Sequence, residues 1–385
     1  MVSLWRSVRV TALSHCEHAS VCLFLKAIMK IFFNELHSIH SARQEIYRGK
    51  MVPAFETPAR QTAIEQALKA RGLGELLIPT QCDDALLTRV HDRDYLRFLE
   101  GAWAEWVALD PANADTEAFP AVWPIRTLRT DIVPDNFCAK LGRYSMDSGS
   151  PLTAGTWRAA RRGADCAAAA ARVVHAGESI AVALARPPGH HAGADFFGGY
   201  CFINHAAVAA QQLRDLGVAH VTVLDVDYHH GNGTQAIFYE RDDVTFISIH
   251  GDPRTEYPFY LGHADERGAG AGEGFNLNLP LAHGTGPKGW FAALDRACEA
   301  IRVSGCGALV ISLGLDTFAD DPVSSSAGFA GFGLRALEFA QMGRVLAALN
   351  IPTVVVFEGG YASEALGDNF VEVLRAWQVD GGLTA

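Results

Sequence analysis

Four side chains that can bind metal or move protons lie within six residues of one another in the segment Leu224–Thr234. Two carboxylates, Asp225 and Asp227, are followed by two imidazoles, His229 and His230. An apolar run precedes them and a glycine-rich turn follows, which is typical of a buried parallel strand that ends in a polar site. Open α/β sheets place their ligand sites at the carboxyl ends of strands, so this segment is the first candidate site.

Asp227 and His229 stand two residues apart, and side chains at that spacing on an extended chain point to the same side. A carboxylate oxygen and an imidazole nitrogen that converge there suit a divalent metal such as zinc. His230 falls outside this alternation and is not expected to be a ligand. The alternative is a hydrated loop whose Asp and His side chains cap the next helix.

Three further motifs place reactive side chains where strands are expected to end. They carry the adjacent imidazoles His190 and His191, the carboxylate Asp316, and a glycine pair followed by Tyr361. Each has a simpler explanation on its own, since Asp316 would serve as a helix cap and Tyr361 as a half-buried core phenol. Together with the first segment they bring carboxylates, imidazoles and a phenol to four strand ends, which indicates an active site.

The number of candidate ligands favours a catalytic metal. Asp227, His229 and Asp316 would provide three protein ligands and leave one position open for water or substrate. Two carboxylates would also balance the charge of a divalent ion. Such an ion acts as a Lewis acid and activates water.

The His pair is suited to proton transfer, provided that each ring has a partner to fix its tautomer. Asp225 and Asn232 are the nearest candidate partners for His190 and His191. If one ring meets the carboxylate and the other meets the neutral amide, their pKa values should be driven apart. The ring backed by the carboxylate should be the more basic.

Apolar β-branched runs alternate with helical periodicity along the chain, which predicts one parallel sheet with helices on both faces. No linker divides the chain and no repeat of solenoid length is present. The expected strands are Ile28–Phe33, Glu75–Ile78, Ser179–Leu184, Val221–Asp225, Val244–His250, Ala308–Leu313 and Thr353–Phe357. The expected helices are Arg60–Arg71, Asp92–Leu109, Gly155–His175, His205–Leu216, Lys288–Val303, Leu334–Leu349 and Ala362–Trp377. The segment Asp110–Pro151 has little periodicity and is either a functional loop or a passive surface excursion.

The overall composition excludes some classes of protein. The 385 residues carry a formal net charge of −11 and no Lys/Arg-rich run, which argues against a nucleic-acid-binding surface. Eight cysteines form no CxxC pair, which favours buried free thiols in a reducing compartment, the cytoplasm. No apolar stretch is long enough to span a membrane.

Residues 1–28 are expected to be a disordered extension or to start upstream of the true start codon, with a weak targeting segment as the alternative.

The ordered set of motifs resembles the histone deacetylase superfamily, and within it the bacterial acetylpolyamine amidohydrolases. The matching segments run from Met29 nearly to the C-terminus and are Val52–Glu56, Pro187–Gly193, Phe197–Asn204, Asp225–Gln235, Leu313–Phe318 and Glu358–Tyr361. The resemblance implies a single-domain, arginase- and deacetylase-like open α/β sheet over residues 29–385, with an insertion at about 103–151. It also implies hydrolysis of an N-acetyl amide.

The resemblance also assigns roles to residues. It implies that Zn²⁺, or alternatively Fe²⁺, is held by Asp227, His229 and Asp316. His190 and His191 would flank the metal-activated water, with His191 as general base and then acid, and Tyr361 would donate to the oxyanion.

Further implied positions concern potassium and the substrate channel. A structural potassium ion would be held by Asp225, Asp227, His229, Ser248 and Ile249, and a second by carbonyls near Phe238, Arg241, Val244 and Phe275. Tyr200 and Tyr257 would wall the substrate channel.

The chain departs from the family pattern in the insertion, which in the relatives builds a homodimer and supplies glutamates that favour a cationic chain. Those positions fall near Cys138 and Gly149 here. Asp147 is the nearest acidic residue and is expected either to take their place in the substrate channel or to be a solvated loop aspartate. Acetylputrescine or acetylcadaverine is the expected substrate, with acetyl-lysine in a protein as the alternative. Two other classes stay open: a non-catalytic acetyl-amine-binding module, and an arginase-type dinuclear hydrolase, which needs more bridging ligands than the sequence supplies.

Overall fold

The computed structural model describes residues 28–121, 129, 131–324 and 331–379. The expected extension at residues 1–28 therefore lies, apart from Ile28, outside the described residues. Within the described ranges no helix is both long and apolar enough to cross a membrane.

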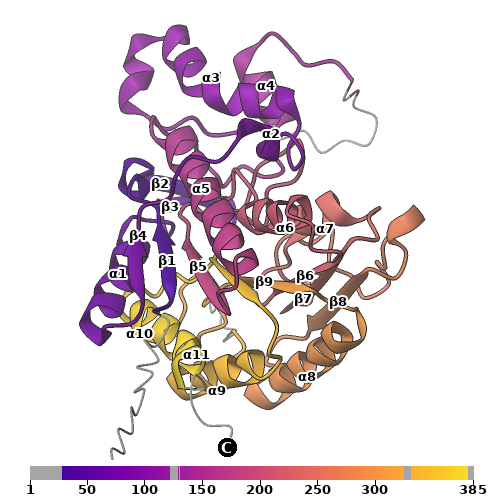
Figure 1. Ribbon diagram of the computed structural model, residues 1–385. Helices are drawn as coiled ribbons and strands as arrows, with labels where there is room; N and C mark the ends of the chain where they lie inside the picture. The colour runs from indigo at the N-terminus through magenta and orange to yellow at the C-terminus, as the bar shows by residue number, and fades with distance from the viewer. Residues whose placement is uncertain (1–27, 122–128, 130, 325–330, 380–385) are drawn as a thin grey trace, which may run out of the picture.

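An eight-stranded sheet forms the centre of the molecule (Figure 1), and every neighbouring pair of strands is parallel. Its strand order is β4-β1-β5-β10-β9-β6-β7-β8. The strands are β1 (Lys30–Phe33), β4 (Glu75–Leu77), β5 (Ile180–Leu184), β6 (Val221–Asp225), β7 (Val244–Gly251), β8 (Asn276–Leu281), β9 (Ala308–Leu313) and β10 (Thr353–Phe357). The expected open parallel sheet is confirmed, and all seven expected strands belong to it.

Helices cover both faces of the sheet, as expected. The principal helices are α1 (Ala59–Arg71), α3 (Arg93–Leu109), α5 (Thr156–His175), α6 (His205–Asp215), α8 (Pro287–Val303), α9 (Ala336–Ala347) and α10 (Ser363–Leu374). Shorter ones are α2 (Asp84–Leu87), α4 (Phe137–Arg143), α7 (Asn232–Phe238) and α11 (Ala376–Val379). The observed ends of these seven helices lie within three residues of the expected ones, and helix boundaries are the least well-defined part of such a prediction.

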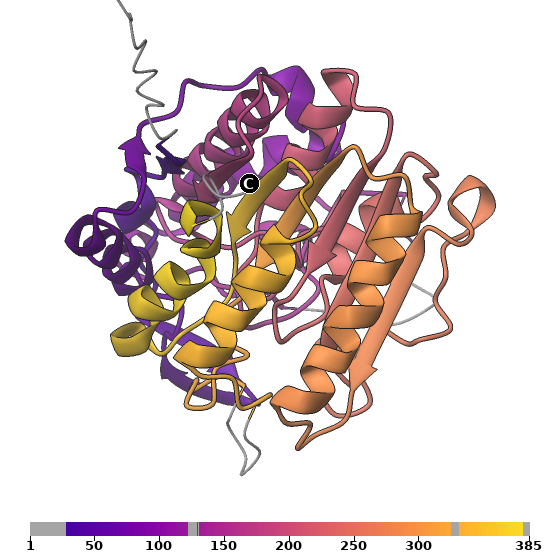
Figure 2. The same ribbon diagram turned by 60° about the horizontal axis from the view of Figure 1, so that its bottom comes forward.

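The alternation of side chains along the strands divides the core into two layers. In β5, Ala181 and Ala183 pack into the core beneath α5 and α6, whereas Ile180, Val182 and Leu184 pack into the core beneath α1, α8, α9 and α10. Figure 2 shows α8, α9 and α10 lying across the second face. Because both faces are covered, the strands are almost wholly apolar until they reach their carboxyl ends.

Four of the elements that the sequence did not predict are the two strands of a hairpin, an edge strand and a short helix of the insertion. β2 (Gln44–Tyr47) and β3 (Lys50–Pro53) form a separate antiparallel hairpin. β8 was missed because its sequence, NLNLPL, contains residues that are uncommon in strands, which an edge position tolerates. The segment 110–151 was expected to lack regular structure, yet it contains α4, whose first turn is capped by the Asn136 side chain.

Candidate active site

The four strands whose ends carry reactive side chains are neighbours in the sheet. β10 lies between β5 and β9, and β9 lies between β10 and β6. Since all four run in parallel, the loops that follow them meet at one edge. The motifs that stand far apart in the sequence are thereby brought to one place.

Asp227, His229 and Asp316 form a buried group in which one ligand atom from each residue lies within 4.8 Å of the others. His229 Nδ1 is 3.0 Å from Asp316 Oδ2 and 3.4 Å from Asp227 Oδ1. The strand ends at Asp225, so Asp227 and His229 lie in the turn beyond it rather than on the strand itself. The convergence is as expected, but the turn produces it, and His229 N–H donates to Asp227 Oδ1 within that turn.

Two glycines allow the loops to approach this group closely. A Cβ atom at Gly314 would lie 2.1 Å from Asp227 Oδ2, and one at Gly359 would lie 2.4 Å from the same oxygen. Gly359 N–H instead donates to that oxygen at 2.8 Å. Any larger residue at either position would displace the carboxylate.

The electrostatics of the group favour a bound cation. Burial and the negative charge of Asp227 raise the pKa of Asp316. Burial would raise the pKa of Asp227 as well, but the charges of His190 and His229 hold that pKa below its ordinary value. Two buried carboxylates at such close range are costly unless positive charge lies between them. One imidazole nitrogen and two carboxylate oxygens form a donor set that suits Zn²⁺ or Fe²⁺.

The two imidazoles have different partners, as the sequence predicted. His190 Nδ1 lies 3.0 Å from Asp225 Oδ2, and His191 Nδ1 lies 2.7 Å from Asn232 Oδ1. Burial opposes the charged form of His190, yet the carboxylates of Asp227 and Asp225 raise its pKa to about 10. Burial, reinforced by the charge of His190, lowers the pKa of His191 well below its ordinary value. The two partners therefore drive the pKa values apart in the expected direction.

Tyr361 lies in the loop after β10 and lines the cavity described below. The guanidinium of Arg60 stacks on its ring at 4.5 Å from the centroid, and Arg60 Nε donates to Gly360 O at 2.7 Å. The buried carboxylate of Glu56 binds Arg60 at 2.8 Å and Arg186 at 2.8 Å. Burial raises the pKa of Tyr361, so its hydroxyl keeps its proton. The sequence included Glu56 in a matching motif but gave no indication of Arg60 or Arg186.

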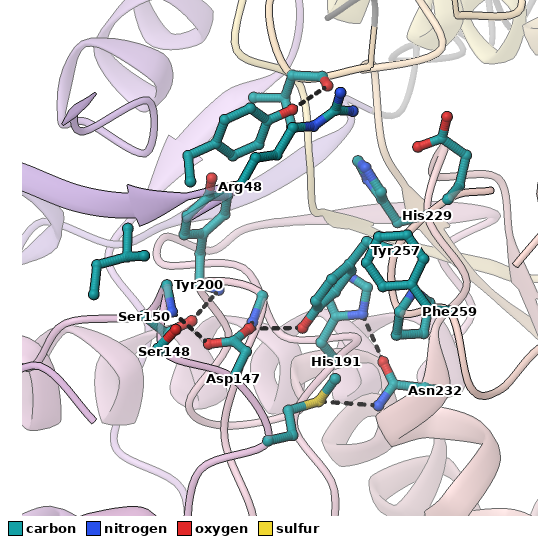
Figure 3. A pocket seen from close by; sticks show the side chains of 18 of the residues that line it. Arg48, Asp147, Ser148, Ser150, His191, Tyr200, His229, Asn232, Tyr257 and Phe259 are labelled. Atoms are coloured by element: carbon teal, nitrogen blue, oxygen red, sulfur yellow. Dashed lines mark hydrogen bonds between the residues drawn. The ribbon is translucent and has the colours of Figure 1, made fainter. Parts of the chain in front are cut away.

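His229 of the Asp227–His229–Asp316 group lines a cavity of about 610 Å³, together with His191 and Tyr361. Its walls come from the β2–β3 hairpin, the end of the insertion and the loop after β7, and it is lined by Ile46, Tyr47, Arg48, Gly49, Met146, Asp147, Ser148, Gly149, Ser150, His191, Phe196, Gly199, Tyr200, His229, Asn232, Glu256, Tyr257, Pro258, Phe259, Tyr260, Leu261, Val323 and Tyr361. Figure 3 shows His191, His229 and Tyr257 close together, with Tyr200 and Asp147 nearby. All three residues expected in the channel, Tyr200, Tyr257 and Asp147, line this cavity.

Asp147 acts as an anchor within the cavity wall. Its Oδ2 accepts a hydrogen bond from the Tyr257 hydroxyl at 2.7 Å (Figure 3). The same oxygen accepts from Gly199 N–H at 2.6 Å. Its Oδ1 accepts from Gly149 N–H at 3.0 Å. The carboxylate thus holds one aromatic wall in place and also adds negative charge to the cavity.

The expected potassium residues are close to one another. Asp225 and Ser248 are register partners on β6 and β7, and Asp225 Oδ1 accepts from Asp227 N–H. The Ser248 hydroxyl lies 2.8 Å from His250 Nδ1. In the second expected set, the carbonyls of Phe238 and Phe275 accept main-chain hydrogen bonds from Arg241 and Phe246.

His230 is buried away from the ligand group, as expected. Its Nε2 lies 3.1 Å from the Gln235 side-chain oxygen, which also accepts from Asn276 and Asn278. The Gln235 amide donates to Glu266, whose carboxylate accepts from two main-chain N–H groups of the loop beyond Leu261. Sequence reasoning missed this link, because it joins side chains of α7, β8 and two separate loops.

Comparison with known proteins agrees with this geometry. Residues 54–377 match the model of the histone deacetylase domain family. The chain is 48% identical over 347 residues to acetylpolyamine amidohydrolase 1 of Pseudomonas aeruginosa, covering 90% of this chain and 98% of that one. It is 43% identical over 347 residues to acetylpolyamine amidohydrolase of Mycoplana ramosa, covering 90% and 99%.

A solved structure is similar over the same length. The crystal structure of acetylpolyamine aminohydrolase from Burkholderia pseudomallei superimposes with a TM-score of 0.85 at 40% identity, covering 91% of this chain and 99% of that one. The resemblance predicted from the motifs is confirmed at the level of family and fold.

Glu45 provides a test of the electrostatics of the cavity wall. Its Oε1 accepts from the Tyr200 hydroxyl at 2.7 Å, and burial raises its pKa to about 7 from an ordinary value of 4.5. The folded state therefore holds this proton more tightly than the unfolded state, and stability is lost as the pH rises from about 4.5 to about 7. We expect Glu45→Gln to lose less thermal stability than the wild type across that interval, measured by calorimetry. The exposed Glu240→Gln should follow the wild type, and parallel curves for Glu45→Gln would contradict the assignment.

Proposed function

Because the chain belongs to the histone deacetylase domain family, we propose that it is a metal-dependent amidohydrolase that removes the acetyl group from N-acetylated amines. The observation that carries the proposal is the convergence of three kinds of group at the end of one cavity. These are a buried ligand triad, a His pair with unequal partners and a tyrosine held in place by a buried arginine. A module that only binds acetylated amines would have no need of all three.

Asp227, His229 and Asp316 would hold the metal, which we propose to be Zn²⁺, with Fe²⁺ as the alternative. Their fit rests on the close approach of the ligand atoms and on the buried negative charge. When bound, such an ion polarises the acetyl carbonyl and makes water a better nucleophile.

We also propose a structural potassium ion at Asp225 and the Ser248 hydroxyl, together with main-chain oxygens of Asp227, His229 and Ile249.

His191 would act as general base and then as general acid. Asn232 Oδ1 accepts the proton on Nδ1, which leaves Nε2 free to take a proton from water. The lowered pKa of His191 keeps the ring neutral before the reaction. It would then return the proton to the amine as that group leaves.

His190 and Tyr361 would stabilise charge rather than take up the proton of water. His190, backed by Asp225, stays protonated and presents positive charge beside Asp227. The Tyr361 hydroxyl would donate a hydrogen bond to the oxygen that becomes negative during attack on the acetyl group. The raised pKa of Tyr361 ensures that it is a donor.

We propose acetylpolyamines of the acetylputrescine and acetylcadaverine type as the substrates. The named relatives support this, and so do Asp147 and Glu256, whose carboxylates line the cavity and favour a cationic chain. Arg48, exposed at the tip of the β2–β3 hairpin, also lines the cavity and would repel a second ammonium group near it. Short monoacetylated diamines are therefore favoured over longer polyamines.

The insertion would join two copies of the chain. Leu109, Ile132 and Val133 expose 58%, 56% and 41% of their surfaces along it, although large apolar side chains are usually covered. Figure 1 shows α3 and α4 at one end of the molecule, beyond the sheet and its covering helices.

We also propose that the protein acts in the cytoplasm, which is consistent with the free thiols of all six described cysteines.

A substrate panel tests the proposed activity. Protein loaded with one equivalent of zinc should hydrolyse N-acetylputrescine and N-acetylcadaverine with a kcat/KM at least about tenfold above that for an acetyl-lysine peptide. Acetylated longer polyamines should fall between them. Preference for the peptide would instead identify a protein deacetylase. If metal-loaded protein turned over nothing in the panel, the binding-module alternative would replace the proposal.

Tyr361→Phe separates oxyanion stabilisation from metal binding. We expect it to retain one bound metal ion and to lose about a hundredfold or more in kcat, because one oxyanion donor is removed. Asp316→Asn should lose metal as well as activity, as measured by elemental analysis. Tyr260→Phe, which alters an exposed hydroxyl on the cavity rim, is the matched control. Full turnover by metal-loaded Tyr361→Phe would remove this residue from the mechanism.

Charge on the insertion should separate the two copies. Ile132→Glu with Val133→Glu should sediment as a monomer, whereas the wild type should sediment as a dimer, since charged groups are costly in an apolar interface. Leu337→Glu, at an equally apolar position exposed to 80% on α9, should leave the dimer intact. A monomeric wild type, or a dimer that persists in the double variant, would refute the proposed interface.

A further inference from the structure

A second buried group of metal-binding side chains lies beside the active site. His190, Cys201 and Glu358 each offer a ligand atom, and these atoms lie within 4.8 Å of one another. All three side chains are buried, and none of them belongs to the triad of Asp227, His229 and Asp316. The sequence assigned no role to Cys201 or Glu358, although both stand in matching motifs.

The fold brings these residues together through neighbouring strands. Glu358 follows β10 directly and His190 follows β5, and these two strands are adjacent in the sheet. Cys201 closes a tight turn with Gly198, in which each residue donates its N–H to the carbonyl of the other, at 3.1 and 2.9 Å. Main-chain hydrogen bonds thus hold the thiol in place.

Glu358 has one carboxylate oxygen in use and one without a partner. Oε2 accepts from Gly189 N–H at 2.7 Å and from His190 N–H at 3.1 Å. Oε1 is buried and has no hydrogen-bond partner among the described residues. A buried carboxylate oxygen that no donor satisfies is costly, and a cation would relieve that cost. Burial raises the pKa of Glu358 to about 7, which expresses the same cost.

Cys201 determines which cation would fit. Its Sγ donates a hydrogen bond to Gly199 O at 3.3 Å, a neutral main-chain partner that a thiolate could give up. A thiolate combined with an imidazole and a carboxylate is a donor set that prefers zinc and similar thiophilic ions over magnesium or calcium. On binding, two protons would pass to solvent, one from the Cys201 thiol and one from the His190 imidazolium, because only the thiolate and the neutral imidazole are ligands.

We propose that His190, Cys201 and Glu358 form a second, weaker site for a thiophilic divalent cation, and that an ion bound there inhibits the enzyme. Inhibition follows because the ion would take a ring nitrogen of His190 in place of its proton, so that this nitrogen could no longer donate a hydrogen bond in the active site. The site is weaker than the triad because binding requires a buried thiol to ionise. Only the effect on turnover rests on the proposed function; occupancy of the site does not.

Cobalt provides a direct measurement, because the triad contains no sulfur. Metal-free full-length protein titrated with Co²⁺ should show ligand-field bands with the first equivalent and a near-ultraviolet thiolate-to-cobalt band with a further equivalent. Cys201→Ser, which keeps a donor for Gly199 O, should lose the near-ultraviolet band and keep the first-equivalent spectrum. Cys138→Ser, which alters an exposed thiol on α4, should keep both. Glu358→Gln should weaken the second binding step.

Zinc inhibition links the site to turnover. Activity should be maximal at one equivalent of Zn²⁺ and fall with excess. The inhibitory concentration should rise at least about tenfold in Cys201→Ser, with activity at one equivalent unchanged.

Three results would overturn the second site: no near-ultraviolet band in the wild type, a band that persists in Cys201→Ser, or a band that disappears in Cys138→Ser. Equal zinc inhibition of the wild type and Cys201→Ser would overturn its inhibitory role. A cobalt band without any hydrolysis would support the second site while refuting the proposed function, so the two failures are distinguishable.

Discussion

The concentration of buried negative charge at the carboxyl edge of the sheet is the constraint on which the rest of this structure depends. Four buried carboxylates gather there: Asp225 ends β6, and Asp227, Asp316 and Glu358 lie in the loops that follow β6, β9 and β10. Carboxylates in such surroundings need donors or cations. The main chain supplies part of what is needed, through N–H groups of Tyr228, His229 and Gly359 and of the residues around His190. A protonated His190 and a metal would supply the remaining positive charge. The groups proposed for catalysis would therefore also meet an electrostatic requirement of the fold.

The same charge distribution gives the two imidazoles different properties. They are adjacent in sequence and their ring centroids are 3.9 Å apart, so a single charge is the most that the pair can carry at low cost. The carboxylate partner draws that charge to His190, and the amide partner leaves His191 neutral. The difference between a carboxylate partner and an amide partner is therefore enough to make one imidazole cationic and to leave the other a neutral base. The Arg60 guanidinium plays a comparable part for Tyr361, since it fixes the ring while burial keeps the phenol protonated.

The fold and most of the buried site could be predicted because their signals are local. A strand covered on both faces shows as a continuous apolar run, and the polar residues that end it stand next to that run in sequence. The rest depends on contacts between distant segments. Arg60 is one charged residue in a helix with little amphipathic pattern, and only the fold shows that it lies against Tyr361. β8 and the β2–β3 hairpin consist of polar or mixed residues whose pairing, not composition, makes them strands. The sequence around Cys201 and Glu358 gives no indication of a shared site. They lie close together because β5 and β10 are adjacent in the sheet.

Chemistry and specificity occupy different parts of the architecture. The groups proposed to react follow central strands, and main-chain hydrogen bonds fix several of them. The cavity walls come from the hairpin tip at Arg48, the insertion at Asp147 and the segment from Tyr257 to Leu261. In that segment Phe259 and Tyr260 expose 51% and 85% of their surfaces, so substitution there costs the core little. Asp147 joins two of these walls through the Tyr257 hydroxyl, and the Gln235–Glu266 link connects the segment beyond Leu261 to His230, next to the proposed ligand His229. Selectivity for the amine can therefore change through the walls alone, whereas a change at the strand ends disturbs the charge balance that holds the site together.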